Sequence, residues 1–250
     1  MKRILSLTLA FSLATILSAR STDEAGTPYR GWKKGEMDIH HIYPGRGEAN
    51  FYIFPDGTSM LIDTGDHLAS VPMTDPKPNL SRRAGEWVSR YILRTNPSGN
   101  KVDYLMVSHF HDDHMGAVSE MLPGKNGYGL SGITLVGEFV DFGTLIDRNY
   151  PDYDFPSRKK INGANKGFMP EYFKFIEYKQ AQGMKMERFD VGALNQIKLL
   201  NDPKKSRKNF EIRNLAANGE VWTGVGTAAE KQYSGDPTLF DENVNSTALV

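Results

Sequence analysis

The chain has 250 residues, 39% of them hydrophobic, so it can bury a sizeable core as one large domain or two small ones. Its 30 basic and 30 acidic residues balance, which excludes a molecule-wide electrostatic attraction to nucleic acid. It has no cysteine, which excludes disulfides, cysteine nucleophiles and thiolate metal sites and leaves His, Asp and Glu as metal ligands.

The N-terminus has the features of a bacterial-type secretory signal peptide. Lys2 and Arg3 precede an uncharged, apolar run over residues 4–17, and small residues follow it. The run is shorter than the roughly 20 residues that a membrane span needs. We therefore expect a signal peptide at residues 1–20, no transmembrane span after its removal, and an exported protein, periplasmic or extracellular.

The first elements expected after it are a hairpin and a helix. Residues 21–36 are polar and contain Gly and Pro, which indicates a leader segment ahead of a domain over residues 37–250. Two apolar segments flank Pro-Asp-Gly-Thr within residues 51–66, which predicts a β-hairpin. Apolar residues then recur at helical spacing over residues 84–97, where a proline ends the predicted helix.

The middle of the chain alternates strands and helices. Apolar patterns predict three regular segments there: a buried strand at residues 102–107, a strand at 133–140 and a helix at 169–182. The helix is expected to turn Phe173, Ile176 and Tyr172 inward. The polar, aromatic and turn-rich residues 141–167 favour a long loop or insertion.

The last part of the chain is expected to form β-structure. Residues 185–222 predict two or more strands, and residues 243–250 predict another. That final strand stops without a turn or a polar tail, so we expect a chain that is truncated at its C-terminus. Alternating strands and helices after an early hairpin predict an α/β layered fold.

Metal-binding residue types gather directly after the buried strand predicted in the middle of the chain. Residues 109–114 read His-Phe-His-Asp-Asp-His and hold three of the chain's six histidines. In a loop that leaves a sheet, His109 and His111 can point the same way. Asp113 and His114 can then reach a second ion nearby, and two such ions can hold a bridging hydroxide. A plain polar loop is the simpler alternative for one histidine, but four ligand-type residues in this register favour a metal site, with Asp113 also orienting water.

This motif and residues 45–66 together resemble the metallo-β-lactamase superfamily. The earlier stretch is similar to the family's N-terminal hairpin, and Asp63 stands where that hairpin ends in an aspartate-bearing turn. The resemblance implies an αββα sandwich, here its N-terminal portion with an incomplete second half. It implies that Asp63 supports the metal loop by hydrogen bonding rather than by ligation. It also implies Zn²⁺ as cofactor, two ions in the complete domain, with iron or manganese as alternatives.

Residues 241–250 resemble one branch of that superfamily, the branch that includes the periplasmic domain of the DNA-uptake competence protein ComEC. The shared feature is an Asn-x-Asn-Ser strand, which in that branch leads to a metal-bridging aspartate and a His-His-Gly motif that these 250 residues do not contain. That branch often has aspartate in place of His111. No histidine follows His114, so the third histidine of β-lactamases, glyoxalase-II-like enzymes and lactonases is missing, which argues against those activities and leaves the remaining ligands open.

Other candidate residues have simpler interpretations. His40 and His41 lie on a predicted strand, where one faces inward and a structural role is favoured. His67 lies at the metal rim by family resemblance, or is a solvated loop residue. The basic residues within 202–213 can grip phosphates but are more often a solvated turn. The aromatic residues within 150–155 can stack on bases or sugars, although such residues usually pack against the domain.

The residues and the resemblance together predict an exported metal-dependent hydrolase that uses a metal-bound hydroxide. The branch resemblance favours a phosphodiester-type substrate, so the partner implied is a small-molecule or phosphodiester substrate, with nucleic acid as a less supported alternative. Two alternatives stay open. One is a lactam, amide or other ester hydrolase with the same metal loop, and the other is a non-catalytic metal-binding domain of the same fold.

Overall fold

The computed structural model of the protein describes residues 25–202 and 210–250. Residues 31–250 pack as one compact unit, and residues 25–30 fall in a separate N-terminal unit. The signal peptide predicted at residues 1–20 lies outside the described residues and stays a prediction. Among the described helices, none combines the length and the apolar character that crossing a bilayer requires.

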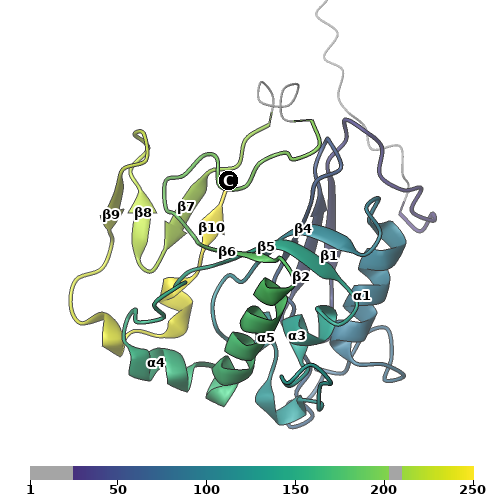
Figure 1. The fold of residues 1–250 in the computed structure, drawn as a ribbon, viewed down its shortest axis with the longest axis horizontal. Coiled ribbons are helices and arrows are strands. Elements are labelled where there is room, and N and C mark those ends of the chain that lie inside the picture. The colour runs from purple at the N-terminus through teal and green to yellow at the C-terminus, as the bar shows by residue number, and fades with distance from the viewer. Residues whose placement is uncertain (1–24, 203–209) are drawn as a thin grey trace, which may run out of the picture. The chain divides into compact units, whose positions relative to one another are not determined.

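A six-stranded mixed sheet forms the centre of the compact unit (Figure 1). Its strands lie side by side in chain order: β1 (Asp38–Ile42), β2 (Ala49–Ile53), β3 (Ser59–Ile62), β4 (Lys101–Met106), β5 (Asp141–Asp147) and β6 (Lys185–Arg188). β1, β2 and β3 pair antiparallel, whereas β3, β4, β5 and β6 pair in parallel. The hairpin predicted within residues 51–66 and the buried strand predicted at 102–107 are therefore confirmed.

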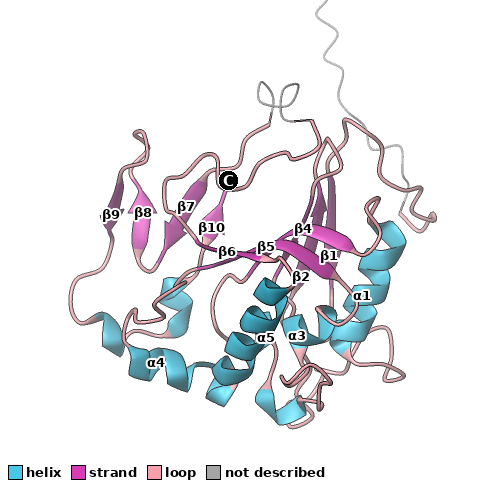
Figure 2. Cartoon of the chain, in the orientation of Figure 1, coloured by secondary structure: helices cyan, strands magenta, loops and turns pink. Residues whose placement is uncertain are grey.

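Three helices cover one face of this sheet (Figure 2). They are α1 (Ala84–Thr95), α3 (Gly132–Val136) and α5 (Met169–Ala181), and both helices predicted from spacing are confirmed. Val88 and Ile92 of α1 pack with Leu105 of β4 in one buried apolar cluster. On α5, Tyr172 and Ile176 are buried as predicted, but Phe175 rather than Phe173 completes the inward face, and Phe173 is only partly buried.

A second, smaller sheet packs on the opposite face of the first. Its strand order is β10 (Ala248–Leu249), β7 (Asn214–Ala217), β8 (Glu220–Trp222) and β9 (Ala229–Lys231). Met60, Met106 and Ile146 of the first sheet share an apolar cluster with Ala217 and Leu249 of the second. The layers are thus helices, sheet and sheet, which confirms the α/β prediction. Side chains of β8 and β9 stay partly or fully exposed, and in the described part of the chain no helix covers the outer face of this sheet (Figure 2).

The strand predicted at residues 133–140 is wrong. Its first residues belong to α3, residues 137–139 form a turn, and Val140 precedes β5. The backbone N–H of Ser131 donates to Thr134 Oγ1 at 2.9 Å, which fixes the start of a helical turn. All five residues of α3 are buried, so the run is apolar on every side and carries no helical period that distinguishes it from a buried strand.

The long loop predicted at residues 141–167 is also wrong at both of its ends. It begins with β5 and finishes with α4 (Arg158–Gly163) and the 3₁₀ turn η2 (Ala164–Gly167). The polar residues that suggested a loop are held by tertiary contacts. Asp147, at the end of β5, is fully buried and accepts hydrogen bonds from the hydroxyls of Tyr153 and Tyr172 at 2.7 and 2.8 Å.

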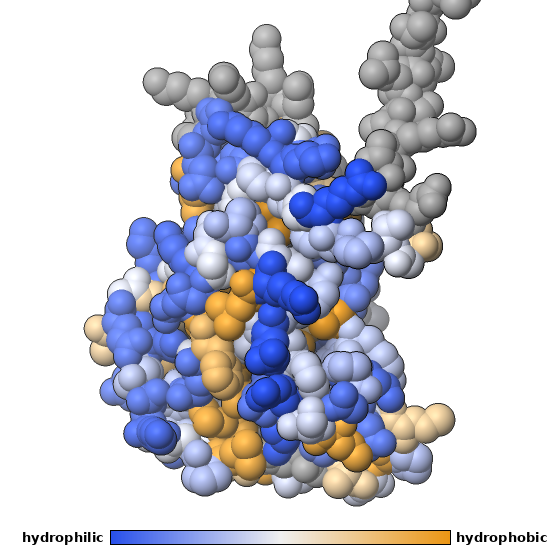
Figure 3. All heavy atoms as spheres, turned by 90° about the vertical axis from the view of Figure 1, so that its right-hand side faces the viewer, coloured by the Kyte–Doolittle hydropathy of each residue, from blue (hydrophilic) through white to orange (hydrophobic). Residues whose placement is uncertain are grey.

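The side of the molecule that carries α1 is mostly hydrophilic, with an apolar band across it (Figure 3). Exposed apolar residues of β1 and α1 include Ile39, Tyr91 and Leu93. A shallow hollow of about 680 Å³ lies between Tyr43 and α1. None of the candidate metal residues lines it, so this hollow is separate from the site described next.

Candidate metal centre

The candidate metal residues lie where parallel strands of the first sheet end. Asp63 directly follows β3, and the loop that begins at Ser108 follows β4. These two strands pair in parallel, so their carboxyl ends meet at one edge of the sheet. The backbone N–H of Asp63 donates to the carbonyl of Met106 at 2.9 Å. The predicted position of Asp63 beside the loop of residues 109–114 is confirmed.

His109 and His111 face each other with their ring nitrogens. His109 Nε2 lies 3.2 Å from His111 Nδ1, and His109 Nδ1 lies 3.1 Å from Ser108 Oγ. Because the Ser108 hydroxyl donates to Asp63 Oδ2 at 2.6 Å, its oxygen is free to accept a hydrogen bond from the Nδ1–H group of His109. That tautomer leaves a lone pair on His109 Nε2, directed at His111, which is how a histidine presents itself to a metal.

The pKa of His109 favours the neutral, ligand-competent form. Burial, followed by the nearby charges of His114 and His111, lowers the pKa of the His109 imidazole to about 3. A metal ligand must be deprotonated, so no proton competes with a cation at His109 over the neutral pH range.

Asp63 orients His114 from behind. Its Oδ2 lies 2.8 Å from His114 Nδ1, and its carboxylate also accepts from the backbone N–H of Ser108 at 2.7 Å. Burial raises the pKa of the fully enclosed Asp63 carboxyl, although the hydrogen bonds from His114 and Ser108 oppose that rise. For His114, burial alone would lower the pKa, but the hydrogen bond to Asp63 and the charges of Asp63 and Asp113 outweigh it and raise the pKa.

The opposite edge of the His114 ring is directed at Asp113. His114 Nε2 lies 3.9 Å from Asp113 Oδ2, and the Asp113 side chain is 35% exposed. A carboxylate oxygen and an imidazole nitrogen therefore share a solvent-accessible edge, while the other ring nitrogen is held by Asp63. Carboxylate-held histidine is the usual arrangement around a protein-bound metal.

Two glycines allow the neighbouring segments to close on this loop. Gly47 has φ of +66°, and a Cβ at Gly47 or at Gly65 would collide with the backbone carbonyl of Asp113. The backbone N–H of Thr64 donates to the carbonyl of His114 at 2.8 Å. The two glycine-containing turns thus hold the end of the loop by close backbone approach, which only residues without a side chain permit.

A second group of possible ligands includes Glu48, which the sequence reasoning missed. Ligand atoms of Glu48, Asp63 and His114 all lie within 4.8 Å of one another. The Asp63 carboxylate already accepts three hydrogen bonds, two from Ser108 and one from His114. These hydrogen bonds occupy the Asp63 carboxylate, and the ring nitrogen of His114 that Asp63 does not hold is the one nearer Asp113. The sequence signal that could have identified Glu48 is an acidic residue directly before β2.

The C-terminal segment is seated directly on the metal loop. Glu242 Oε1 accepts from the backbone N–H of Phe110, between the two histidines, at 3.0 Å. Arg148 clamps the same carboxylate through Nε and Nη2, each at 2.7 Å, and stacks on the Phe110 ring at 4.5 Å. Thr247 N–H donates to the carbonyl of Ser108 at 2.9 Å. Sequence reasoning missed Arg148 and Glu242, because nothing local marks a contact across 94 positions.

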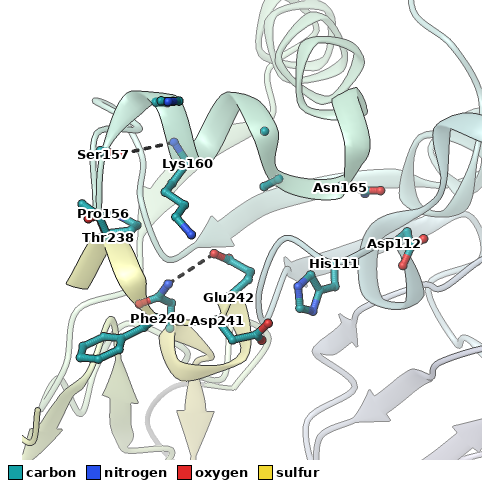
Figure 4. Close-up of a pocket in the computed structure, with 14 residues that line it drawn as sticks. His111, Asp112, Pro156, Ser157, Lys160, Asn165, Thr238, Phe240, Asp241 and Glu242 are labelled. Atoms are coloured by element: carbon teal, nitrogen blue, oxygen red, sulfur yellow. Dashed lines mark hydrogen bonds between the residues drawn. The ribbon is translucent and has the colours of Figure 1, made fainter. Parts of the chain in front are cut away.

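A pocket of about 650 Å³ opens beside His111 (Figure 4). Its walls come from the metal loop, from α4 with η2, and from residues 237–245 of the C-terminal segment. Figure 4 shows the Asp241 carboxylate turned toward the His111 ring. A small molecule or one unit of a polymer fits beside the metal loop in a space of this size.

The remaining candidates have structural contacts. His40 is buried with its Nδ1 2.9 Å from the Tyr91 hydroxyl, and the exposed His41 has its Nδ1 2.6 Å from Asn50 Oδ1. His67 lies 3.5 Å from its neighbour Asp66.

Two surface segments were also candidates from the sequence. The aromatic loop packs against the domain, where Tyr153 and Phe173 have ring centroids 4.7 Å apart. The basic residues at 203–209 lie outside the described residues.

Comparison with known proteins adds the family. Residues 44–126 match the family described as the metallo-β-lactamase superfamily, and this range holds Asp63 and the whole loop of residues 109–114. The similarity to the metallo-β-lactamase superfamily is thus found over residues 44–126, less than half of the chain. A curated relative, ribonuclease Z of Staphylococcus saprophyticus, is 24% identical over 160 residues, which is 56% of this chain and 52% of that protein. The chain thus matches about half the length of this relative.

The loop of residues 109–114 offers donors that fit a divalent cation. Imidazole and carboxylate are ligands for zinc, iron and manganese, and the facing nitrogens of His109 and His111 lack any other protein acceptor or donor among the described residues. His114 keeps one ring nitrogen for a metal because Asp63 occupies the other. The arrangement therefore gives a possible divalent-metal site whose metal identity the donor set does not select.

His111→Ala is expected to reduce the metal content of the protein by at least one ion. His111 is only partly buried, so its removal leaves the core intact while it deletes one of the two facing nitrogens. Elemental analysis after zinc loading and dialysis measures the loss, and circular dichroism confirms the fold. His41→Ala, on an exposed histidine outside the loop, is the matched control. Equal metal content in His111→Ala and wild type would rule out this residue as a ligand.

Proposed function

We propose that the protein is an exported metal-dependent hydrolase of phosphodiester bonds, with zinc as its metal. The observation that carries the proposal is the facing pair of His109 Nε2 and His111 Nδ1, 3.2 Å apart, beside a His114 that Asp63 holds. The superfamily match over residues 44–126 supports a hydrolase. Export rests on the N-terminal sequence and is tested by whether the protein appears in the periplasmic or culture fraction.

The residues divide into two ligand sets. His109 and His111 would hold one cation, and Asp113 and His114 would hold the other. A bound divalent cation supplies positive charge for the scissile bond and lowers the pKa of the attacking water. Asp113 would also orient that water, because its carboxylate is partly exposed at the edge of the loop. Asp63 keeps His114 in one tautomer throughout.

Three observations favour a phosphodiester over a lactam. The curated relative, about half of whose length aligns with this chain, is named as a ribonuclease. No histidine follows His114, so the third histidine that lactamases use is not supplied by these residues. The pocket beside His111 is lined by the lysines of α4, which suit an anionic substrate.

Turnover of bis-p-nitrophenyl phosphate by the zinc-loaded protein tests the proposal. We expect hydrolysis that chelation by EDTA abolishes and that zinc, manganese or iron restores to different extents. Nitrocefin is expected to remain uncleaved. Cleavage of nitrocefin but not of the phosphodiester would make the protein a lactam hydrolase. Metal binding without turnover of either compound would leave a non-catalytic metal-binding domain.

A further inference from the structure

Two lysines of α4 line the same pocket as His111. Lys159 and Lys160 are exposed, and neither forms an ion pair within residues 25–202 and 210–250. Figure 4 shows the Lys160 side chain extending from α4 into the pocket, on the side of Glu242. Both ammonium groups are therefore available to a ligand that enters beside the metal loop.

Most carboxylates of this pocket are already neutralised by arginines. Asp112 pairs with Arg46 at 2.8 Å, and Glu242 pairs with Arg148 at 2.7 Å. Asp241 is the carboxylate of the pocket without an arginine; it accepts from the backbone N–H of Asn243 at 2.9 Å and faces His111 (Figure 4). The end of the pocket at α4 thus carries excess positive charge, while the carboxylate lies at the metal end.

The rest of the lining suits a nucleotide-sized group. Ser157, Thr238 and Asn245 offer hydroxyl and amide groups, and Phe240 offers an aromatic ring. A volume of about 650 Å³ exceeds what a single phosphate needs and accommodates a sugar and a base next to it. An aromatic ring beside basic side chains is a common way to hold single-stranded nucleic acid without sequence preference.

We infer that this pocket binds a neighbouring, uncleaved phosphate of the substrate at Lys159 and Lys160, and that the substrate is a single-stranded oligonucleotide rather than an isolated diester. The inference rests on the proposed function, because it places the scissile phosphodiester at the metal loop and the next phosphate at α4. It makes α4 the element that selects a polymer over a small phosphodiester.

Binding without turnover isolates this site from catalysis. In EDTA, a short fluorescein-labelled oligothymidylate should bind the Lys159→Gln, Lys160→Gln double variant about tenfold more weakly than wild type, by fluorescence anisotropy. The dependence of log affinity on log salt should become shallower by roughly 0.7 for each lysine removed. The control double variant, Lys125→Gln with Lys185→Gln, removes two exposed lysines that do not line the pocket and should bind like wild type.

A turnover arm separates the inference from the proposed function. In the zinc-loaded α4 double variant, kcat/KM should fall about tenfold more for the oligothymidylate than for bis-p-nitrophenyl phosphate, which has no second phosphate. Lysine-dependent binding without any hydrolysis would refute the proposed function and keep the pocket as an oligonucleotide site. Equal oligothymidylate affinity in wild type and in the α4 double variant would overturn the inference, even with an active enzyme.

Discussion

Glu242→Gln is expected to destabilise the folded protein by about 3–5 kcal/mol, because it removes the carboxylate that pairs with the buried charge of Arg148. The Arg148 side chain is fully buried, and Glu242 receives two of its hydrogen bonds. Burial lowers the pKa of Arg148, and the charge of Glu242 opposes that fall. Glutamine also directs an N–H group at a guanidinium that can only donate. The variant therefore loses the ionic attraction and in addition places two hydrogen-bond donors against each other.

Urea denaturation of the metal-free protein measures this effect as a lower midpoint with an unchanged slope. Asp241→Asn, on the neighbouring carboxylate, is the matched control and should change stability by less than about 0.5 kcal/mol. The double variant Arg148→Met, Glu242→Gln should be less destabilised than the sum of the two single variants, because no charge then stays buried. A Glu242→Gln midpoint equal to that of Asp241→Asn would show that the clamp does not hold the metal loop.

Asp63→Asn is expected to weaken zinc binding by roughly 10- to 100-fold, the usual cost of removing the carboxylate that orients a metal-binding histidine. The amide keeps the shape of the side chain but loses the charge that holds His114 Nδ1 at 2.8 Å and Ser108 at 2.6 Å. The pKa of His114, which is raised above the ordinary histidine value in wild type, should fall below that value in Asp63→Asn. In wild type, burial lowers this pKa and the interactions with Asp63 and Asp113 more than compensate, so that removing the Asp63 charge lets burial prevail.

A competition titration with a zinc-binding dye gives the affinity, and NMR titration of the histidine rings in metal-free protein gives the pKa. Asp112→Asn is the matched control, since Asp112 lies in the same loop but pairs with Arg46 at 2.8 Å. We expect its zinc affinity to stay near that of wild type. An unchanged affinity and an unchanged His114 pKa in Asp63→Asn would mean that Asp63 is only a turn residue.

The sequence predicted those parts of the site that are determined by residues close together along the chain. The loop of residues 109–114 directly follows the apolar residues 102–107, which predict a buried strand. The hairpin within residues 51–66 contains the turn residues that predict it. Both features can be recognised within about 20 residues. Parallel pairing of β3 with β4 then brings Asp63 to the loop, as the family resemblance implied. The same applies to α1, whose apolar spacing and terminal proline lie in one segment.

The parts that the sequence missed depend on contacts between distant residues. Glu242 reaches Phe110 across 132 positions, and no local pattern marks either residue. The strand β5 contains polar residues that only its buried position explains, such as Asp147 with its two tyrosine hydroxyls. α3 is apolar on all sides, so its helical period is hidden. In each case tertiary contacts decide a structure that local propensity leaves ambiguous.

Anomalous diffraction at the zinc edge, from crystals of the zinc-loaded protein, locates the metal ligands directly. We expect one peak between His109 Nε2 and His111 Nδ1 and a second peak against Asp113 and His114 Nε2, with Asp63 still hydrogen-bonded to His114 Nδ1. A peak held instead by Glu48, Asp63 and His114, with His109 and His111 free of metal, would contradict this expectation.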